Sequence, residues 1–155
     1  MGKALVLHRS TVAASWSCLL ENANGNAARI YRSTAAAILA SNIPDVYLER
    51  TLVKPSSWSK LEREYLLVTN ERFRAQIFIG SHDYGTNLAI YWYLVVSAPD
   101  LFTSLGDFHL FQQQELHAYV TVIHRCLHHA IAELLSFGQE PSQLETTSTG
   151  FLGVE

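Results

Sequence analysis

Histidine is the residue type in this chain that is best suited to chemistry, and three of its seven histidines fall on one predicted helical stripe. His117, His124 and His128 are spaced at i, i+7 and i+11, which places them within about 40° of one another on a helix. His124 and His128 are one turn apart, so their imidazoles can share a zinc, manganese or iron ion. His117 lies two turns from His124, too far to bind the same ion. The spacing therefore supports at most two metal ligands.

A complete metal site requires further ligands from other segments. The candidates are His82 and Asp83, or Asp107 and His109 near the start of the same helix. Nothing in the sequence shows that these side chains converge on one point. The competing interpretation, which we favour, is that the histidines form an amphipathic border between the apolar helix face and water. Metal binding through the one-turn histidine pair is the alternative, and we expect no cofactor.

A second candidate is a surface on which aromatic rings lie beside guanidinium groups. Alternation along the predicted strands 72–80 and 88–96 turns one set of side chains away from the helices. That outward set is Arg72, Arg74, Phe78, Tyr91 and Tyr93. Such a surface suits a protein interface, the stacking of bases or the pairing of carboxylates. The alternative is a solvated sheet face, or one that the chain's own tail covers.

The segment 88–96 favours a partner on that face. It is dense in β-branched and aromatic residues on both parities of a strand. Such a strand requires cover on both faces, and a chain of 155 residues has helices for one of them. The other face must be covered by a ligand, a partner protein or a second copy of the chain. We therefore expect a non-catalytic interaction module that forms a homodimer through this sheet face.

The elements that position these residues indicate a single α+β domain. Helices are predicted at 11–21 and 26–40, separated by the Asn- and Gly-containing break 22–25, and at 108–136. The apolar positions of the last helix form one continuous face: Leu116, Val120, Ile123, Leu127, Ala130, Ile131 and Leu134. We expect the helices to pack mainly on one face of a sheet.

That sheet is predicted to be a four-stranded antiparallel meander. Its strands are expected at 46–54, 64–69, 72–80 and 88–96, with a loop at 81–86. The connections between these strands are too short for parallel crossovers, which need a dozen or more residues.

Residues 1–137 form the predicted domain, and the polar, aperiodic segment 138–155 is predicted to be a flexible tail. Cys18 and Cys126 are expected to be buried thiols.

Composition narrows the choice of partners and compartment. Only 16% of the residues are charged, against roughly 25% in soluble domains, and such a surface favours self-association. A net charge of −3 gives no global field for nucleic acid or an anionic membrane. Binding of an anionic ligand or nucleic acid through Arg72 and Arg74 is a third alternative. The sequence has no membrane span and no phosphate loop, nucleophile elbow or zincin motif. We expect a cytoplasmic protein without a membrane partner.

Overall fold

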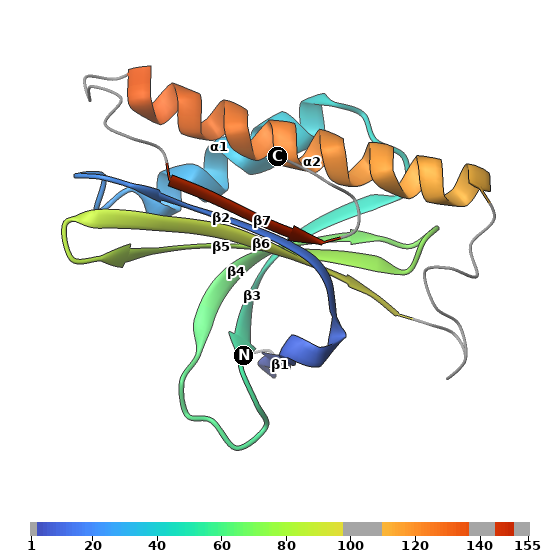
Figure 1. Cartoon of the computed structure of the whole chain (residues 1–155), viewed down its shortest axis with the longest axis horizontal. Coiled ribbons are helices and arrows are strands. Elements are labelled where there is room, and N and C mark those ends of the chain that lie inside the picture. The colour runs from blue at the N-terminus through green and yellow to red at the C-terminus, as the bar shows by residue number, and fades with distance from the viewer. Residues whose placement is uncertain (1–2, 98–109, 137–144, 151–155) are drawn as a thin grey trace.

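The computed structural model describes residues 3–97, 110–136 and 145–150. Figure 1 shows the two α-helices together on one side of a sheet. The described elements are β1 (Leu5–Val6), η1 (Arg9–Thr11), β2 (Val12–Leu20), α1 (Ala27–Ala40), β3 (Val46–Lys54), β4 (Arg63–Asn70), β5 (Ala75–Tyr84), β6 (Asn87–Val96), α2 (Leu110–Ser136) and β7 (Glu145–Gly150). The predicted α+β class and the long C-terminal helix are confirmed.

All of the strands in the described residues belong to one seven-stranded sheet with the order β1-β3-β4-β5-β6-β2-β7. β3, β4, β5 and β6 follow one another as antiparallel neighbours. β2 pairs antiparallel with both β6 and β7, and β1 pairs parallel with β3. The predicted four-stranded meander is therefore the central part of a larger, mixed sheet.

The prediction of a helix at 11–21 is wrong, because this segment forms β2. Every second side chain of β2 is buried, namely Ala14, Trp16, Cys18 and Leu20. Burial with a period of two is typical of a strand that packs one face on a core. Alanine's helix propensity is small beside the burial of these side chains against the helices. The break that follows β2 does adopt the left-handed conformation, at Asn22 (φ 55°) and Gly25 (φ 85°).

β5 differs from its predicted strand at both ends. The third predicted strand begins at Ala75 rather than at residue 72, because Glu71–Arg74 form the turn between β4 and β5. In this turn Asn70 Oδ1 accepts hydrogen bonds from the N–H groups of Arg72 and Phe73. The predicted loop 81–86 is wrong for residues 81–84, which continue β5 into a tight hairpin with β6.

The main core lies between the sheet and the two helices. α1 contributes Ile30 and Ile38, and every one of the seven apolar positions predicted for α2 is buried there. Cys18 and Cys126 are both buried, as predicted. Burial raises the pKa of both thiols, that of Cys18 to about 12. In the part of the chain that the structure describes, no helix combines the length and apolarity needed to cross a bilayer.

The structure describes only a part of the predicted tail. Glu145–Gly150 form β7, which pairs with Ala14–Leu19 of β2. Segments 137–144 and 151–155 lie outside the described residues, as does the predicted start of the last helix at 108. The domain boundary at 137 and the flexibility of the tail stay predictions.

Candidate functional site: a pocket on the second sheet face

The sheet face turned away from the helices has a second, smaller core of its own. It consists of Val53, Tyr65, Leu67, Phe78 and Tyr91, against which Leu7, Ala89, Tyr93 and Val95 pack. Figure 1 shows β3 and β4 curving away from the helices toward their shared loop, with β1 beside them. This curvature brings side chains from β3 to β6 together, so the single chain covers a large part of its own second face.

Phe78, Tyr91 and Tyr93 lie on this second face, in agreement with the predicted alternation. Phe78 is 3% exposed and Tyr91 is 8% exposed, so neither ring needs a partner molecule for cover. Tyr93 is half-buried and lines a pocket. The chain therefore covers Phe78 and Tyr91 by itself, without a second copy, and self-association through these residues stays a prediction.

Gly80 allows the tyrosines of this face to pack closely. Gly80 pairs with Tyr65 on one side and with Tyr91 on the other. A Cβ at position 80 would lie 2.8 Å from Cε1 of Tyr65 and would overlap the ring of Tyr91. The ring of Tyr91 in turn contacts those of Tyr65 and Tyr93, at centroid distances of 5.7 and 5.6 Å. Tyr65, Tyr91 and Tyr93 thus form one continuous aromatic wall, which we call the tyrosine wall.

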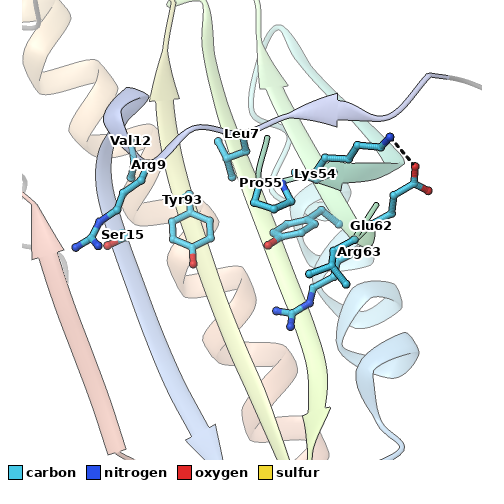
Figure 2. Close-up of a pocket in the computed structure, with 12 residues that line it drawn as sticks. Leu7, Arg9, Val12, Ser15, Lys54, Pro55, Glu62, Arg63 and Tyr93 are labelled. Carbon is cyan, nitrogen blue, oxygen red and sulfur yellow. Dashed lines mark ion pairs between the residues drawn. The ribbon is translucent and has the colours of Figure 1, made fainter. Parts of the chain in front are cut away.

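A pocket of about 760 Å³ lies at the end of the tyrosine wall where Tyr65 and Tyr93 face it. Figure 2 shows that it opens between the N-terminal segment and the hairpin of β3 and β4. Its volume falls within the usual range for small-molecule sites, roughly 300–1,000 Å³. Apolar surface comes from Leu7, Val12, Val53, Pro55 and Leu61.

Local hydrogen bonds place Arg9 at this pocket. The N–H of Leu7 donates to the carbonyl of Lys54 at 2.9 Å, which extends the parallel pairing of β1 with β3. The chain then turns through η1, where the N–H and the hydroxyl of Thr11 both donate to the carbonyl of His8, at 3.0 and 2.7 Å. Arg9 begins this turn and lines the pocket opposite the β3–β4 hairpin (Figure 2).

The charged side chains at the pocket are Arg9, Lys54, Glu62 and Arg63. Lys54 Nζ and Glu62 Oε1 form an ion pair of 3.3 Å, drawn as a dashed line in Figure 2. Arg9 and Arg63 form no ion pair with any residue in the described ranges 3–97, 110–136 and 145–150. The pocket therefore carries two positive charges in excess, which favours an anionic ligand.

The hydroxyl of Tyr93 lies in the field of both arginines. Burial raises the pKa of Tyr93 and Tyr91 adds to the rise, whereas Arg63 and Arg9 lower it. The net shift is upward, so the phenol stays protonated at neutral pH and can donate a hydrogen bond. Burial also raises the pKa of Tyr65, together with its hydrogen bond to Tyr91. The site thus combines two cations, neutral hydroxyl donors and apolar walls.

The predicted arginines Arg72 and Arg74 do not lie in this site, which corrects their placement on the outer face. Both are exposed in the turn before β5, and Arg74 has the left-handed φ of 50°. Arg72 Nη2 forms an ion pair of 3.0 Å with Glu115 Oε2 of α2, toward the helix side. The predicted strand began too early, so its alternation assigned these two residues to the wrong environment. Anion binding through them stays a prediction.

The structure brings His124 and His128 together where α2 packs on the sheet, with His124 buried and His128 half-buried. Their ring centroids are 4.3 Å apart, and both rings contact Trp16. His124 is only 4% exposed, so the predicted border between helix and water is wrong for this residue. Trp92 Nε1–H donates to His124 Nδ1 at 3.0 Å. The pair therefore belongs to the packing between α2 and the sheet.

The other predicted metal ligands lie elsewhere. His82 is on the second face, where its Nδ1 lies 3.0 Å from the hydroxyl of Tyr91, and Asp83 Oδ1 accepts a hydrogen bond from the N–H of Gly25. Asp107 and His109 fall outside the described residues. Among the residues that are described, no group of three or more His, Cys, Asp or Glu side chains could hold a metal ion. Metal binding by the histidine pair stays a prediction.

Sequence reasoning missed the pocket residues Arg9, Arg63 and Leu7. One signal was available for Arg63, because it lies two residues before Tyr65 and shares its strand face if β4 is extended to its true start. No comparable signal existed for Arg9 and Leu7, which the pairing of β1 with the distant β3 brings to the pocket.

In comparisons with known proteins, no family model, no curated protein and no solved structure matches this chain.

Proposed function

We propose that this protein is a non-catalytic binding protein that holds one small molecule with an anionic head and an apolar body. The molecule would occupy the pocket between the N-terminal segment and the β3–β4 hairpin. One observation carries the proposal: an apolar, tyrosine-lined pocket bears Arg9 and Arg63, neither of which has an acidic partner among the described residues. The volume of about 760 Å³ admits a medium-chain carboxylate or an aromatic acid.

The head of the ligand would be recognised by charge-assisted hydrogen bonds. A guanidinium group presents paired N–H donors that match the oxygens of a carboxylate, sulfonate or phosphate. Arg9 and Arg63 both line the pocket, and the neutral hydroxyl of Tyr93 adds a further donor. Two cations with a neutral donor favour a single anionic group over an uncharged one.

The apolar body would supply the larger share of the affinity. Both arginines are exposed, and exposed ionic contacts contribute only about 0–1 kcal/mol each. Burying about 150 Å² of apolar ligand surface contributes about 4 kcal/mol at ~25 cal/mol/Å². A ligand without an apolar part would therefore bind weakly. The preferred ligand is therefore an amphiphile and not inorganic phosphate.

Decanoate is a suitable probe, with 1-decanol as the uncharged control and inorganic phosphate as the control without an apolar body. We expect decanoate to raise the melting temperature and to show saturable binding by calorimetry. The two controls should bind at least about tenfold more weakly. Arg9→Gln and Arg63→Gln should each weaken decanoate binding about three- to tenfold. Arg125→Gln, at an exposed position of α2, is the matched control and should leave the affinity unchanged.

Two results would contradict the proposal. If Arg9→Gln/Arg63→Gln binds decanoate as tightly as the wild type, the arginines do not recognise the head. If neither decanoate nor an anionic aromatic probe such as anilinonaphthalene sulfonate binds saturably, the pocket is not a site for amphiphiles. Circular dichroism and the urea midpoint of each variant would show that the fold is intact.

A further inference from the structure

The loop between β3 and β4, residues 55–62, presents two large apolar side chains to solvent. Trp58 is 93% exposed and Leu61 is 75% exposed. The loop has internal order, because the N–H of Ser59 donates to the carbonyl of Ser56 at 3.2 Å and the N–H of Leu61 donates to Ser59 Oγ at 3.0 Å. Figure 1 shows this hairpin projecting away from the helix layer. The two apolar side chains thus occupy a structured, protruding tip.

The same tip is basic, although the whole chain is acidic. Lys60 lies between the two apolar residues in sequence, and Lys54 and Arg63 flank the loop. Glu62 is the one acidic residue of the segment 54–63, and it pairs with Lys54. Three basic residues against one acidic residue give the segment a net charge of +2, against −3 for the chain. The absence of a membrane partner was expected from the net charge of the whole chain. This tip has a charge of the opposite sign, so that expectation does not apply to it.

We propose that the β3–β4 loop docks the protein on an anionic lipid membrane. Trp58 and Leu61 would insert among the lipid headgroups, and Lys60 would face the lipid phosphates. Tryptophan is enriched at the level of the headgroups, where its ring is half apolar and its N–H stays hydrated. Basic side chains beside an apolar surface add attraction to anionic lipids.

A lipid surface fits this tip better than a protein does. A stable protein interface buries about 800 Å² per partner in a complementary patch. The large apolar side chains exposed on the loop itself are Trp58 and Leu61, which stand on a narrow hairpin next to charged Lys60 and Glu62. A bilayer accepts a protrusion of any shape and needs no complementary surface. The geometry therefore favours shallow insertion over docking on a second protein.

Docking would also give the pocket a membrane-side entrance. Leu61 and Arg63 belong both to the tip and to the lining of the pocket. An amphiphile of the kind proposed above itself partitions into membranes, so it could pass between bilayer and pocket along this loop. This link rests on the proposed function, whereas membrane docking does not.

The test uses the whole chain with vesicles of phosphatidylcholine containing about one third phosphatidylserine, and with pure phosphatidylcholine vesicles as the uncharged arm. Trp16 and Trp92 are buried, so a blue shift of the tryptophan emission reports on Trp58. We expect co-sedimentation with the anionic vesicles, accompanied by this shift and weakened by salt. Trp58→Ser/Leu61→Ser should reduce the partition coefficient at least about tenfold, and Lys60→Gln by a smaller factor. Leu39→Ser, at a 69% exposed position of α1, is the matched control.

Two outcomes would overturn the docking proposal. Vesicle binding that is equal in Trp58→Ser/Leu61→Ser and the wild type would show that the loop is not the contact. If vesicles do not bind, and sedimentation velocity instead shows self-association that this double variant abolishes, the tip is a protein interface. Decanoate titration without vesicles tests the pocket separately, so a failure of either proposal can be recognised by itself. Since both side chains are exposed, their removal should leave the fold intact.

Discussion

The indole N–H of Trp92 donates a hydrogen bond to Nδ1 of His124, at 3.0 Å, between β6 and α2. Both side chains are buried in the main core. Because Nδ1 accepts this bond, neutral His124 carries its proton on Nε2. The bond joins a central strand to the long helix in the buried core, where an unpaired polar group lowers the free energy of unfolding.

Replacing His124 by leucine should therefore destabilise the protein. The variant His124→Leu leaves the N–H of Trp92 without its acceptor, at an expected cost of about 1–3 kcal/mol in the free energy of unfolding. Urea denaturation measures this difference. His117→Leu, the same substitution at an exposed position of α2, should change stability by no more than about 0.5 kcal/mol. Equal stability of the two variants would show that the Trp92–His124 bond contributes nothing.

His128 should make the fold sensitive to mild acid. Burial lowers the pKa of His128 from the ordinary value of 6.5, and its Nε2 is buried without a hydrogen-bond partner among the described residues. The unfolded chain therefore binds a proton at a higher pH than the folded chain does. Stability is then full above pH 6.5 and falls as the pH drops below 6.5 toward the lowered, folded-state pKa.

Urea midpoints at pH 7.5 and pH 5.5 would measure this dependence. In His128→Phe the midpoint should fall less on acidification than in the wild type, whereas exposed His129→Phe should behave like the wild type. A part of the dependence should persist, because burial and Arg63 also lower the pKa of His82. An unchanged pH dependence in His128→Phe would refute the assignment.

The two thiols should be unreactive in the native protein. Cys18 and Cys126 are buried, and burial raises the pKa of both, so each lacks the thiolate and the access that reaction requires. With Ellman's reagent at pH 8, we expect slow reaction of the native chain and prompt reaction of two thiols per chain in guanidinium chloride. Prompt reaction of one thiol in the native state, lost in Cys126→Ser, would show that the region around α2 opens readily.

The parts of the fold that could be predicted are those with one clear hydrophobic period. The predicted strand 46–54 coincides with β3, the predicted strand 88–96 differs from β6 by one residue, and the predicted helix 26–40 differs from α1 by one. β2 was harder to predict from the sequence, because alanine and serine are compatible with a helix. The pairing of β2 with β6 and β7, which makes it a strand, is a tertiary effect.

Only a part of the candidate site could be predicted from the sequence. Alternation placed Phe78, Tyr91 and Tyr93 on the correct face, because the side-chain period of a strand is a local property. Their burial depends on the curvature of the sheet, which no local pattern reports. The presence of Arg9 and Arg63 in one pocket depends on the parallel contact of β1 with β3, two segments far apart in the chain.

Gly80 should be the position at which the second face tolerates substitution least. A methyl group there would press on the rings of Tyr91 and Tyr65, which are stiff and already packed on neighbouring rings. Gly80→Ala should therefore lower the free energy of unfolding by about 1–3 kcal/mol, measured by urea denaturation. It should also weaken decanoate binding, because Tyr65 lines the pocket.

A double-mutant cycle separates this steric effect from other effects of alanine at position 80. In the background Tyr91→Leu the smaller side chain leaves room for the added methyl group, so Gly80→Ala should there be at least about 1 kcal/mol less damaging. Gly25→Ala is an unsuitable control because Gly25 has a φ of 85°, a conformation that strains an alanine by itself. If Gly80→Ala is equally damaging in both backgrounds, the close packing of Tyr91 on Gly80 is not what requires a glycine here.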